Sequence, residues 1–91
     1  MEKIRREYRF TGRVQGVGFR YHAYHTAQYL GITGWVKNCY DGSVKAQAQG
    51  SKGALKDFLA MLDEGRYIKI DYVEEMELPV DEEERGFRIL H

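Results

Sequence analysis

The chain has 91 residues, which fits one domain over residues 1–91 with a single hydrophobic core and excludes a multidomain protein. Hydrophobic residues make up 43% and charged residues 31% of the sequence, a composition that favours a globular protein and excludes a disordered one. Because 14 basic residues balance 14 acidic residues, no global field attracts nucleic acid or an anionic membrane surface, and any anion must be bound locally.

The first half of the chain predicts three strands and one helix. Apolar or small side chains alternate with polar ones over residues 4–14, which is the period of a half-buried strand. After a glycine-containing stretch, small and apolar side chains recur at helical spacing over residues 19–30, and Gly31 stands where glycine commonly ends a helix. Two alternating segments follow, and the Asp41-Gly42 pair between them is typical of a β-hairpin turn.

The second half of the chain predicts one helix and two strands. Ser51 can cap a helix over residues 52–64, in which leucine and phenylalanine recur at helical spacing. Residues 67–78 are rich in β-forming side chains but alternate imperfectly, so we expect a long strand with a β-bulge. Phe87 and Ile89 mark a short final strand that follows an acidic loop.

The order of these elements predicts an α+β fold of the ferredoxin-like type. It is the split βαβ order, β-α-β-β-α-β, with an extra C-terminal strand. In this arrangement two helices cover one face of an antiparallel sheet.

Charge is distributed unevenly along the chain, although its sum is zero. Residues 1–20 hold six basic side chains against two acidic ones, whereas residues 63–84 hold ten acidic side chains against two basic ones. We interpret the acidic run as solvated faces and a loop.

Residues 12–20, with the sequence GRVQGVGFR, predict a phosphate-binding loop between a strand and a helix. Gly16 and Gly18 allow backbone conformations that other residues avoid, so successive N–H groups can point into one concavity. The N-terminus of the helix adds unpaired N–H groups and the positive end of its dipole. Arg20 can hold a phosphoryl group by two parallel hydrogen bonds. The expected phosphate-binding residues are Gln15, Gly16, Val17, Gly18, Phe19 and Arg20.

Two related phosphate-binding motifs do not fit this loop. No Gly-Lys-Ser/Thr follows it, as a nucleoside-triphosphate loop requires, and the third glycine of a dinucleotide fingerprint is missing. The alternative is that Gly16 and Gly18 only turn the chain.

Asn38 stands at the end of the second predicted strand, next to the hairpin turn. Its parity places it on the same face as Ile32 and Val36, which is the face that the helices cover. An amide there can line the mouth of a site and orient a water molecule toward a phosphorus atom held by Arg20. The alternative is that Asn38 serves only the turn, the commoner role of asparagine at a strand end.

These residues resemble the two signatures of the acylphosphatase family. Residues 12–20 resemble the first signature, and residues 34–38 (GWVKN) with residues 41–44 (DGSV) resemble the second. With the order of elements, the resemblance covers nearly the whole chain. It implies hydrolysis of carboxyl-phosphate anhydrides without a metal or cofactor, by a catalytic arginine that binds phosphate and a catalytic asparagine that orients the attacking water. Those roles fall on Arg20 and Asn38.

Other chemistries fit the sequence less well. A nucleophilic Cys39 would need a thiolate loop that ends in arginine about six positions later, where this chain has Lys45, and strand parity points Cys39 away from Asn38. His22 and His25 have no evident third ligand for a metal. Exposed aromatic side chains could stack on RNA bases, but the aromatic-glycine motif of RNA-recognition strands is absent.

The expected protein is therefore a small acylphosphatase, with no cofactor and no metal. Its expected partners are a small-molecule acyl phosphate and inorganic phosphate or a similar anion, and we expect a monomer that binds neither nucleic acid nor a membrane. The alternative is a non-catalytic phosphate-binding or regulatory module. Because residues 1–10 lack the apolar region of a signal peptide and Cys39 is the only cysteine, we expect a cytoplasmic location.

Overall fold

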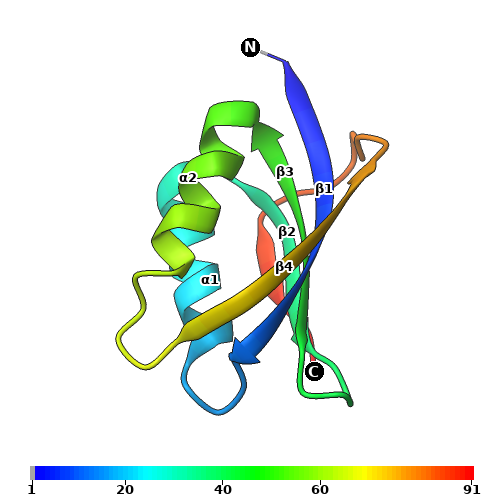
Figure 1. The fold of residues 1–91 in the computed structure, drawn as a ribbon. Helices are drawn as coiled ribbons and strands as arrows, with labels where there is room; N and C mark the ends of the chain where they lie inside the picture. Colours follow the sequence, from blue (N-terminus) through cyan, green and yellow to red (C-terminus); the bar gives the residue numbers. More distant parts are fainter. Residues whose placement is uncertain (1) are drawn as a thin grey trace.

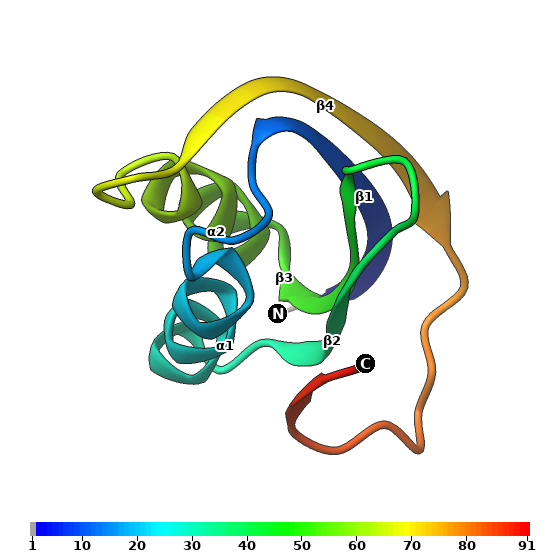
Figure 2. The same ribbon diagram turned by 90° about the horizontal axis from the view of Figure 1, so that it is seen from below.

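A five-stranded sheet carries two helices on one of its faces in the computed structural model, which describes residues 2–91 (Figures 1 and 2). In chain order the elements are β1 (Lys3–Arg13), α1 (Phe19–Leu30), β2 (Thr33–Asn38), β3 (Val44–Ser51), α2 (Lys52–Leu62), β4 (Lys69–Leu78) and β5 (Phe87–Ile89). This is the predicted order, with helix α2 shorter at its C-terminal end and β4 beginning two residues later than expected. No helix within residues 2–91 is long and apolar enough to cross a membrane.

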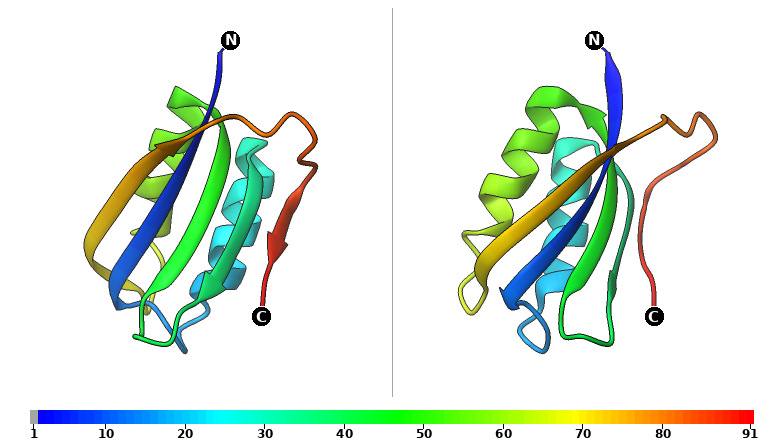
Figure 3. Two further views of the ribbon diagram at one scale, coloured as in Figure 1. Left: turned by 90° about the vertical axis from the view of Figure 1, so that its right-hand side faces the viewer. Right: turned by 45° about the vertical axis from the view of Figure 1, so that its right-hand side comes forward.

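The strands lie in the order β4-β1-β3-β2-β5. The predicted antiparallel pairing is confirmed for β4, β1, β3 and β2, whereas the extra strand β5 runs parallel to β2, so the sheet is mixed. The reason is the path of residues 79–86, which leave β4 at one edge and cross to the opposite edge before β5 begins (Figure 3).

Strand direction gathers three chain segments at one end of the molecule. Strands β1 and β2 are both antiparallel to β3, so they run in the same direction, and β5 runs parallel to β2. The loop after β1, the hairpin after β2 and the end of β5 therefore lie at the same end, as Figure 1 shows. This end holds the residues that the sequence assigns to a phosphate site.

Aromatic and aliphatic side chains fill the space between the sheet and the helices. Phe10 of β1 and Phe19 of α1 have ring centroids 5.1 Å apart, and Phe58 of α2 lies 6.1 Å from Phe87 of β5. These contacts join both helices to the centre and the edge of the sheet. Because interiors are close-packed, the start of α1 is fixed relative to β1.

Local signals in the sequence are confirmed at the ends of the helices and in β4. The Ser51 side chain accepts a hydrogen bond from the Ala54 N–H at 3.1 Å and caps α2. Gly31 ends α1 in the left-handed conformation. The expected bulge is also present, because the pairing of β4 with β1 shifts register between Thr11 and Gly12.

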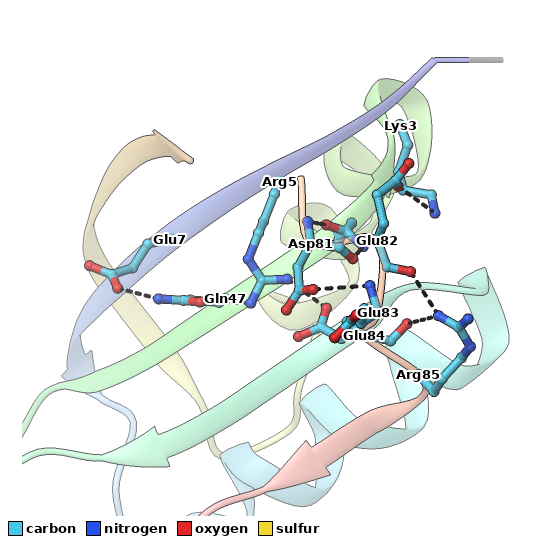
Figure 4. A network of polar contacts seen from close by, with 10 residues as sticks. Lys3, Arg5, Glu7, Gln47, Asp81, Glu82, Glu83, Glu84 and Arg85 are labelled. Carbon is cyan, nitrogen blue, oxygen red and sulfur yellow. Dashed lines mark hydrogen bonds and ion pairs between the residues drawn. The ribbon is translucent and has the colours of Figure 1, made fainter. Parts of the chain in front are cut away.

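Basic residues of β1 form ion pairs with acidic residues from the acidic run near the end of the chain. Arg6 lies 3.6 Å from Glu75 and 3.4 Å from Glu77 on β4. The Arg5 guanidinium donates to Glu84 at 2.6 Å, and these two side chains are only 7% and 8% exposed (Figure 4). The interpretation of the acidic run as solvated is therefore wrong for Glu84, since its side chain is buried in an ion pair with Arg5.

The Tyr8 hydroxyl is buried and has no hydrogen-bond partner among residues 2–91. Burial raises the pKa of Tyr8 above its usual value, and the nearby Arg6 cation opposes this rise without cancelling it. A buried hydroxyl without a partner loses its hydration and gains no bond in return. Tyr8 therefore stabilises the core through its ring, which lies 6.5 Å from that of Phe58.

We expect Tyr8→Phe to raise the free energy of unfolding by about 1 kcal/mol near neutral pH, because it removes the unpaired hydroxyl. Above a pH of about 10, tyrosine in the unfolded chain ionises while the folded protein still holds the Tyr8 proton. The parent therefore loses stability as pH rises, and the advantage of Tyr8→Phe over the parent should grow. Urea unfolding at the two pH values measures both effects, with Tyr72→Phe at an exposed tyrosine as control. A variant less stable than the parent at neutral pH would mean that the hydroxyl is bonded.

Candidate active site

A pocket of about 190 Å³ opens where the loop after β1, the start of α1 and the end of β2 meet. The residues that line it are Val14, Gly16, Gly18, Phe19, Arg20, Tyr21 and Asn38. The structure thus brings Arg20 and Asn38 to one pocket, although a helix and a strand separate them in the sequence.

Two of the expected phosphate-binding residues, Gln15 and Val17, are not among the lining residues. The Gln15 side chain turns toward the β2–β3 hairpin, and Val17 packs against the hydrophobic core. Conversely, Val14 and Tyr21 line the pocket although they are not among the residues that the sequence predicts for it. No pattern marks Tyr21, because an exposed tyrosine in the first turn of a helix looks like ordinary surface.

The loop that forms the floor of the pocket depends on two glycines. Gly16 and Gly18 have φ angles of 72° and 78°, in the region that side chains with a Cβ rarely adopt. A Cβ at either position would meet nothing within 4 Å, so the backbone conformation, not lack of space, requires glycine there. Gly18 is also the N-cap of α1 and offers no side-chain cap, which leaves the first N–H groups of the helix available to an anion.

Arg20 owes its position to the buried residue before it. Phe19 is 1% exposed and packs on Phe10, which fixes the first turn of α1. The Arg20 Nη1 atom lies 3.4 Å from the Leu90 carbonyl oxygen and 3.5 Å from Nδ1 of His91. The Leu90 N–H donates to the Val36 carbonyl at 2.8 Å, so the end of the β5 segment supports the guanidinium beside the pocket.

Asn38 is the last residue of β2 and pairs in register with Val44 of β3. It is exposed, and it lines the same pocket as residues from the start of α1. The predicted parity is therefore confirmed, because Asn38 lies on the helix side of the sheet at the strand end. Its amide can donate and accept hydrogen bonds but cannot gain or lose a proton at neutral pH.

Gln15 connects the loop to the hairpin that carries Asn38. Its side-chain amide donates to the Cys39 carbonyl and to the Ser43 carbonyl, each at 2.8 Å. The Cys39 N–H in turn donates to the Ser43 carbonyl at 2.9 Å. These bonds fix the distance between the two walls of the pocket.

The hairpin is further stabilised by Asp41. Its Oδ1 atom accepts from the Ser43 hydroxyl at 2.6 Å and from the Ser43 N–H at 3.0 Å, and Oδ2 accepts from Arg9 at 2.9 Å. The Ser43 hydrogen bonds hold the pKa of Asp41 below its usual value, with a smaller contribution from the Arg9 charge. The carboxylate thus stabilises the hairpin above a pH of about 4, and this contribution is lost as pH falls below its lowered pKa.

A larger groove of about 650 Å³ lies between the end of α2 and β4, but its charge does not suit a phosphoryl group. Three acidic residues, Asp63, Glu64 and Asp71, are among those that line it. No cationic side chain within the described residues lines it. The groove would therefore repel an anion.

The residues considered for other chemistries, Cys39, His22 and His25, do not line the pocket. Cys39 is partly exposed and does not line it. The Nε2 atom of His22 lies 2.8 Å from the Met61 carbonyl, a bond to α2 that serves helix packing. Over residues 2–91, no group of three or more histidine, cysteine, aspartate or glutamate side chains is close enough to hold a metal ion.

Comparison with known proteins identifies relatives over most of the chain. The family model for Acylphosphatase matches residues 6–89. A Clostridium acetobutylicum protein named Acylphosphatase is 43% identical over 81 residues, which cover 88% of this chain and 89% of the relative. Another, from Caldanaerobacter subterraneus subsp. tengcongensis, is 44% identical over 82 residues, which cover 89% of this chain and 91% of the relative.

The fold is similarly matched by a solved structure. The crystal structure of acylphosphatase from Bacillus subtilis superposes with a TM-score of 0.90 at 34% sequence identity, and the match covers 97% of this chain and 99% of that one. The predicted ferredoxin-like α+β arrangement and the resemblance drawn from the two signatures are confirmed by these matches.

Proposed function

This chain belongs to the acylphosphatase family and hydrolyses acyl phosphates, and we propose that it does so in the pocket between Arg20 and Asn38. The observation that carries this proposal is the convergence of a cation, a glycine loop and an amide on one small pocket. Each of these groups matches one requirement of phosphoryl transfer to water, which needs the phosphoryl oxygens held and the water placed.

In this proposal the Arg20 guanidinium and the backbone N–H groups of residues 15–20 bind the phosphoryl oxygens. The guanidinium can make two parallel hydrogen bonds to one phosphoryl group. Helix α1 adds its positive end, because the first N–H groups follow directly from the uncapped Gly18. The position of Arg20 beside the Leu90 carbonyl supports this role, since it keeps the charge at the mouth of the pocket.

Asn38 orients the water molecule that attacks phosphorus. The new P–O bond forms to the water oxygen, and the bond between phosphorus and the acyl oxygen breaks, which releases a carboxylate and inorganic phosphate. Carboxylate leaves without taking up a proton, so no general acid is needed. No carboxylate or imidazole is among the residues described as lining the pocket, and a phosphoryl oxygen of the substrate accepts the proton of the water.

The rival proposal is a phosphate-binding or regulatory module that keeps the cradle without turnover. Such a module needs Arg20 and the loop but gains nothing from an amide opposite them. The placement of Asn38 in the lining of the pocket favours the enzyme. We also propose that the protein acts as a monomer in the cytoplasm.

We expect the purified protein to hydrolyse benzoyl phosphate or acetyl phosphate at an unchanged rate after treatment with a chelator. The reason is that Arg20 and the backbone N–H groups supply the charge stabilisation that a metal would otherwise provide. Release of inorganic phosphate, measured with and without the chelator, tests this expectation. If activity is lost on chelation and restored by a divalent cation, the metal-free mechanism is wrong.

We expect Gln15→Ala to lower turnover by about 10- to 100-fold, because the loop and the hairpin lose the bonds that set their separation. Gln15→Glu should be at least as poor, since its carboxylate would face the Cys39 and Ser43 carbonyl oxygens. Steady-state kinetics below the unfolding temperature measures the effect. Gln28→Ala, which removes an exposed amide from α1, is the matched control.

Comparing the change in turnover with the change in the Michaelis constant shows whether Gln15 is a positioning residue. If the loop and Asn38 are misaligned, turnover falls more than the Michaelis constant rises. Equal turnover in Gln15→Ala and the parent would contradict the role of these two hydrogen bonds.

A further inference from the structure

A second groove, separate from the active site, lies along the N-terminal half of α2. Its volume is about 470 Å³. The residues that line it are Arg6, Lys52, Gly53, Leu55, Lys56 and Leu59. It shares no lining residue with the pocket of Arg20 and Asn38. The groove therefore offers a distinct surface, with leucine side chains as its apolar part and three cations around them.

The two lysines of this groove lie in an electrostatically unfavourable position on α2. Lys52 and Lys56 are exposed and lie one helical turn apart, so their charges repel each other. Both lie in the N-terminal half of α2, at or near its positive end, and no acidic residue occupies the first turn. Neither takes part in an ion pair within residues 2–91. An anion between them would relieve all of these unfavourable interactions.

Arg6 supplies a third cation from the neighbouring strand β1. Its contacts with Glu75 and Glu77 are long, at 3.6 Å and 3.4 Å, and both acids are at the exposed edge strand β4. Neither acid lines the groove. Arg6 itself lines the groove, so the charge that it shares with Glu75 and Glu77 adds to the cationic rim.

Gly53 lines the groove at a position where a helix would be more stable with alanine. A Cβ at this position would meet nothing within 4 Å, so no neighbour requires the glycine. Its φ is not in the left-handed region either. Gly53 thus leaves open space at its own position, beside Lys56 on the helix surface.

We propose that this groove binds an apolar carboxylate, with the carboxylate between Arg6, Lys52 and Lys56 and the hydrocarbon part against Leu59. Leu55 is fully buried and belongs to the core, whereas Leu59 is half-buried, so the exposed part of Leu59 supplies the apolar contact surface of the groove. Apolar carboxylates are also the class of organic product that hydrolysis of an acyl phosphate releases. Binding here leaves the active site free, because the two sites have no residue in common.

The test uses octanoate, below the concentration at which it forms micelles, with three probes that separate charge from chain. Octylammonium keeps the chain and reverses the charge, acetate keeps the carboxylate without the chain, and inorganic phosphate is an anion without a chain. Backbone amide shifts in nuclear magnetic resonance spectra report where each probe binds. We expect octanoate to shift the amides of residues 52–56 and to bind at least tenfold more tightly than the other probes do at this site.

Two variants and a matched control complete the experiment. Lys52→Gln combined with Lys56→Gln, and separately Gly53→Leu, which places a large side chain at a lining position, should each weaken octanoate binding at least tenfold. Lys45→Gln combined with Lys69→Gln removes the same charge outside the groove and should leave affinity within about twofold. Circular dichroism confirms that each variant is folded.

Several results would overturn the proposal. Equal binding of octylammonium would remove the role of charge, and equal binding of acetate would remove the role of the apolar contact surface. Octanoate shifts confined to Gly16, Gly18 and Arg20 would place the carboxylate in the active site instead. Because binding is measured without turnover, failure here is distinguishable from failure of the mechanism proposed for Arg20 and Asn38.

Discussion

Arg20→Ala is expected to lower turnover of an acyl phosphate by at least about 10³-fold and to weaken inhibition by inorganic phosphate at least about tenfold. The guanidinium lines the pocket and is the only cationic side chain among the residues described as lining it. It would contact the phosphoryl oxygens both in the bound substrate and in the transition state, so binding and rate fall together. Steady-state kinetics with phosphate as a competitive inhibitor measures both.

Arg20→Lys tests whether charge alone is sufficient. An ammonium group keeps the positive charge but cannot make the planar pair of hydrogen bonds, so we expect poor rescue of turnover. Arg13→Ala is the matched control, because it removes an exposed cation from the same end of the molecule outside the pocket. Its turnover should stay within about threefold of the parent. Unchanged inhibition by phosphate in folded Arg20→Ala would remove Arg20 from the phosphate site.

The glycine loop and the strand end were predictable from the sequence because their signals are local. The spacing of Gly16 and Gly18 before a helical stripe predicts a loop that opens toward a helix N-terminus, and their φ angles are those of such a loop. Alternation along β2 likewise places Asn38 on the helix side. Two short-range patterns were therefore enough to predict that Arg20 and Asn38 lie at the same end of the sheet, where they line one pocket.

The contacts that support the pocket could not be predicted, because they join side chains to backbone atoms far away in the chain. Gln15 bonds to carbonyl oxygens of the hairpin, and every residue has such an oxygen, so no residue type marks the partner. Leu90 supports Arg20 in the same way through its carbonyl. The resemblance identified the residues at the centre of the site without identifying what holds them.

The direction of β5 and the burial of Glu84 were missed for a related reason. The sequence shows an excess of basic residues at the start and of acidic residues near the end, but charge composition does not assign partners. Arg5 and Glu84 pair across almost the whole chain because residues 79–86 cross the sheet, a path that no periodic pattern encodes. The same crossing delivers β5 to the edge beside β2, parallel to it.

Asn38→Ala is expected to lower turnover by about 10²- to 10³-fold, the usual effect of removing one preorganised hydrogen-bonding group from an active site. Inhibition by inorganic phosphate should change only a few-fold, because the loop from Gln15 to Arg20 belongs to a different segment. This separation distinguishes an enzyme from a phosphate-binding module more sharply than loss of Arg20 does, since Arg20 serves both. The neighbouring variant Cys39→Ser controls for changes in the hairpin and should stay within about threefold of the parent, as Cys39 does not line the pocket.

Asn38→Asp tests whether the shape of the side chain is sufficient or whether the side chain must also be neutral. A carboxylate is nearly isosteric with the amide and can still accept a hydrogen bond from water, but it would stand opposite the phosphoryl group and repel it. We therefore expect Asn38→Asp to lose turnover as Asn38→Ala does and, unlike that variant, to weaken phosphate inhibition. Turnover and the phosphate inhibition constant are measured for both variants after circular dichroism has confirmed folding. If folded Asn38→Ala keeps turnover within about threefold of the parent, Asn38 has no part in the mechanism, and if it loses phosphate binding in parallel with rate, it is a binding residue.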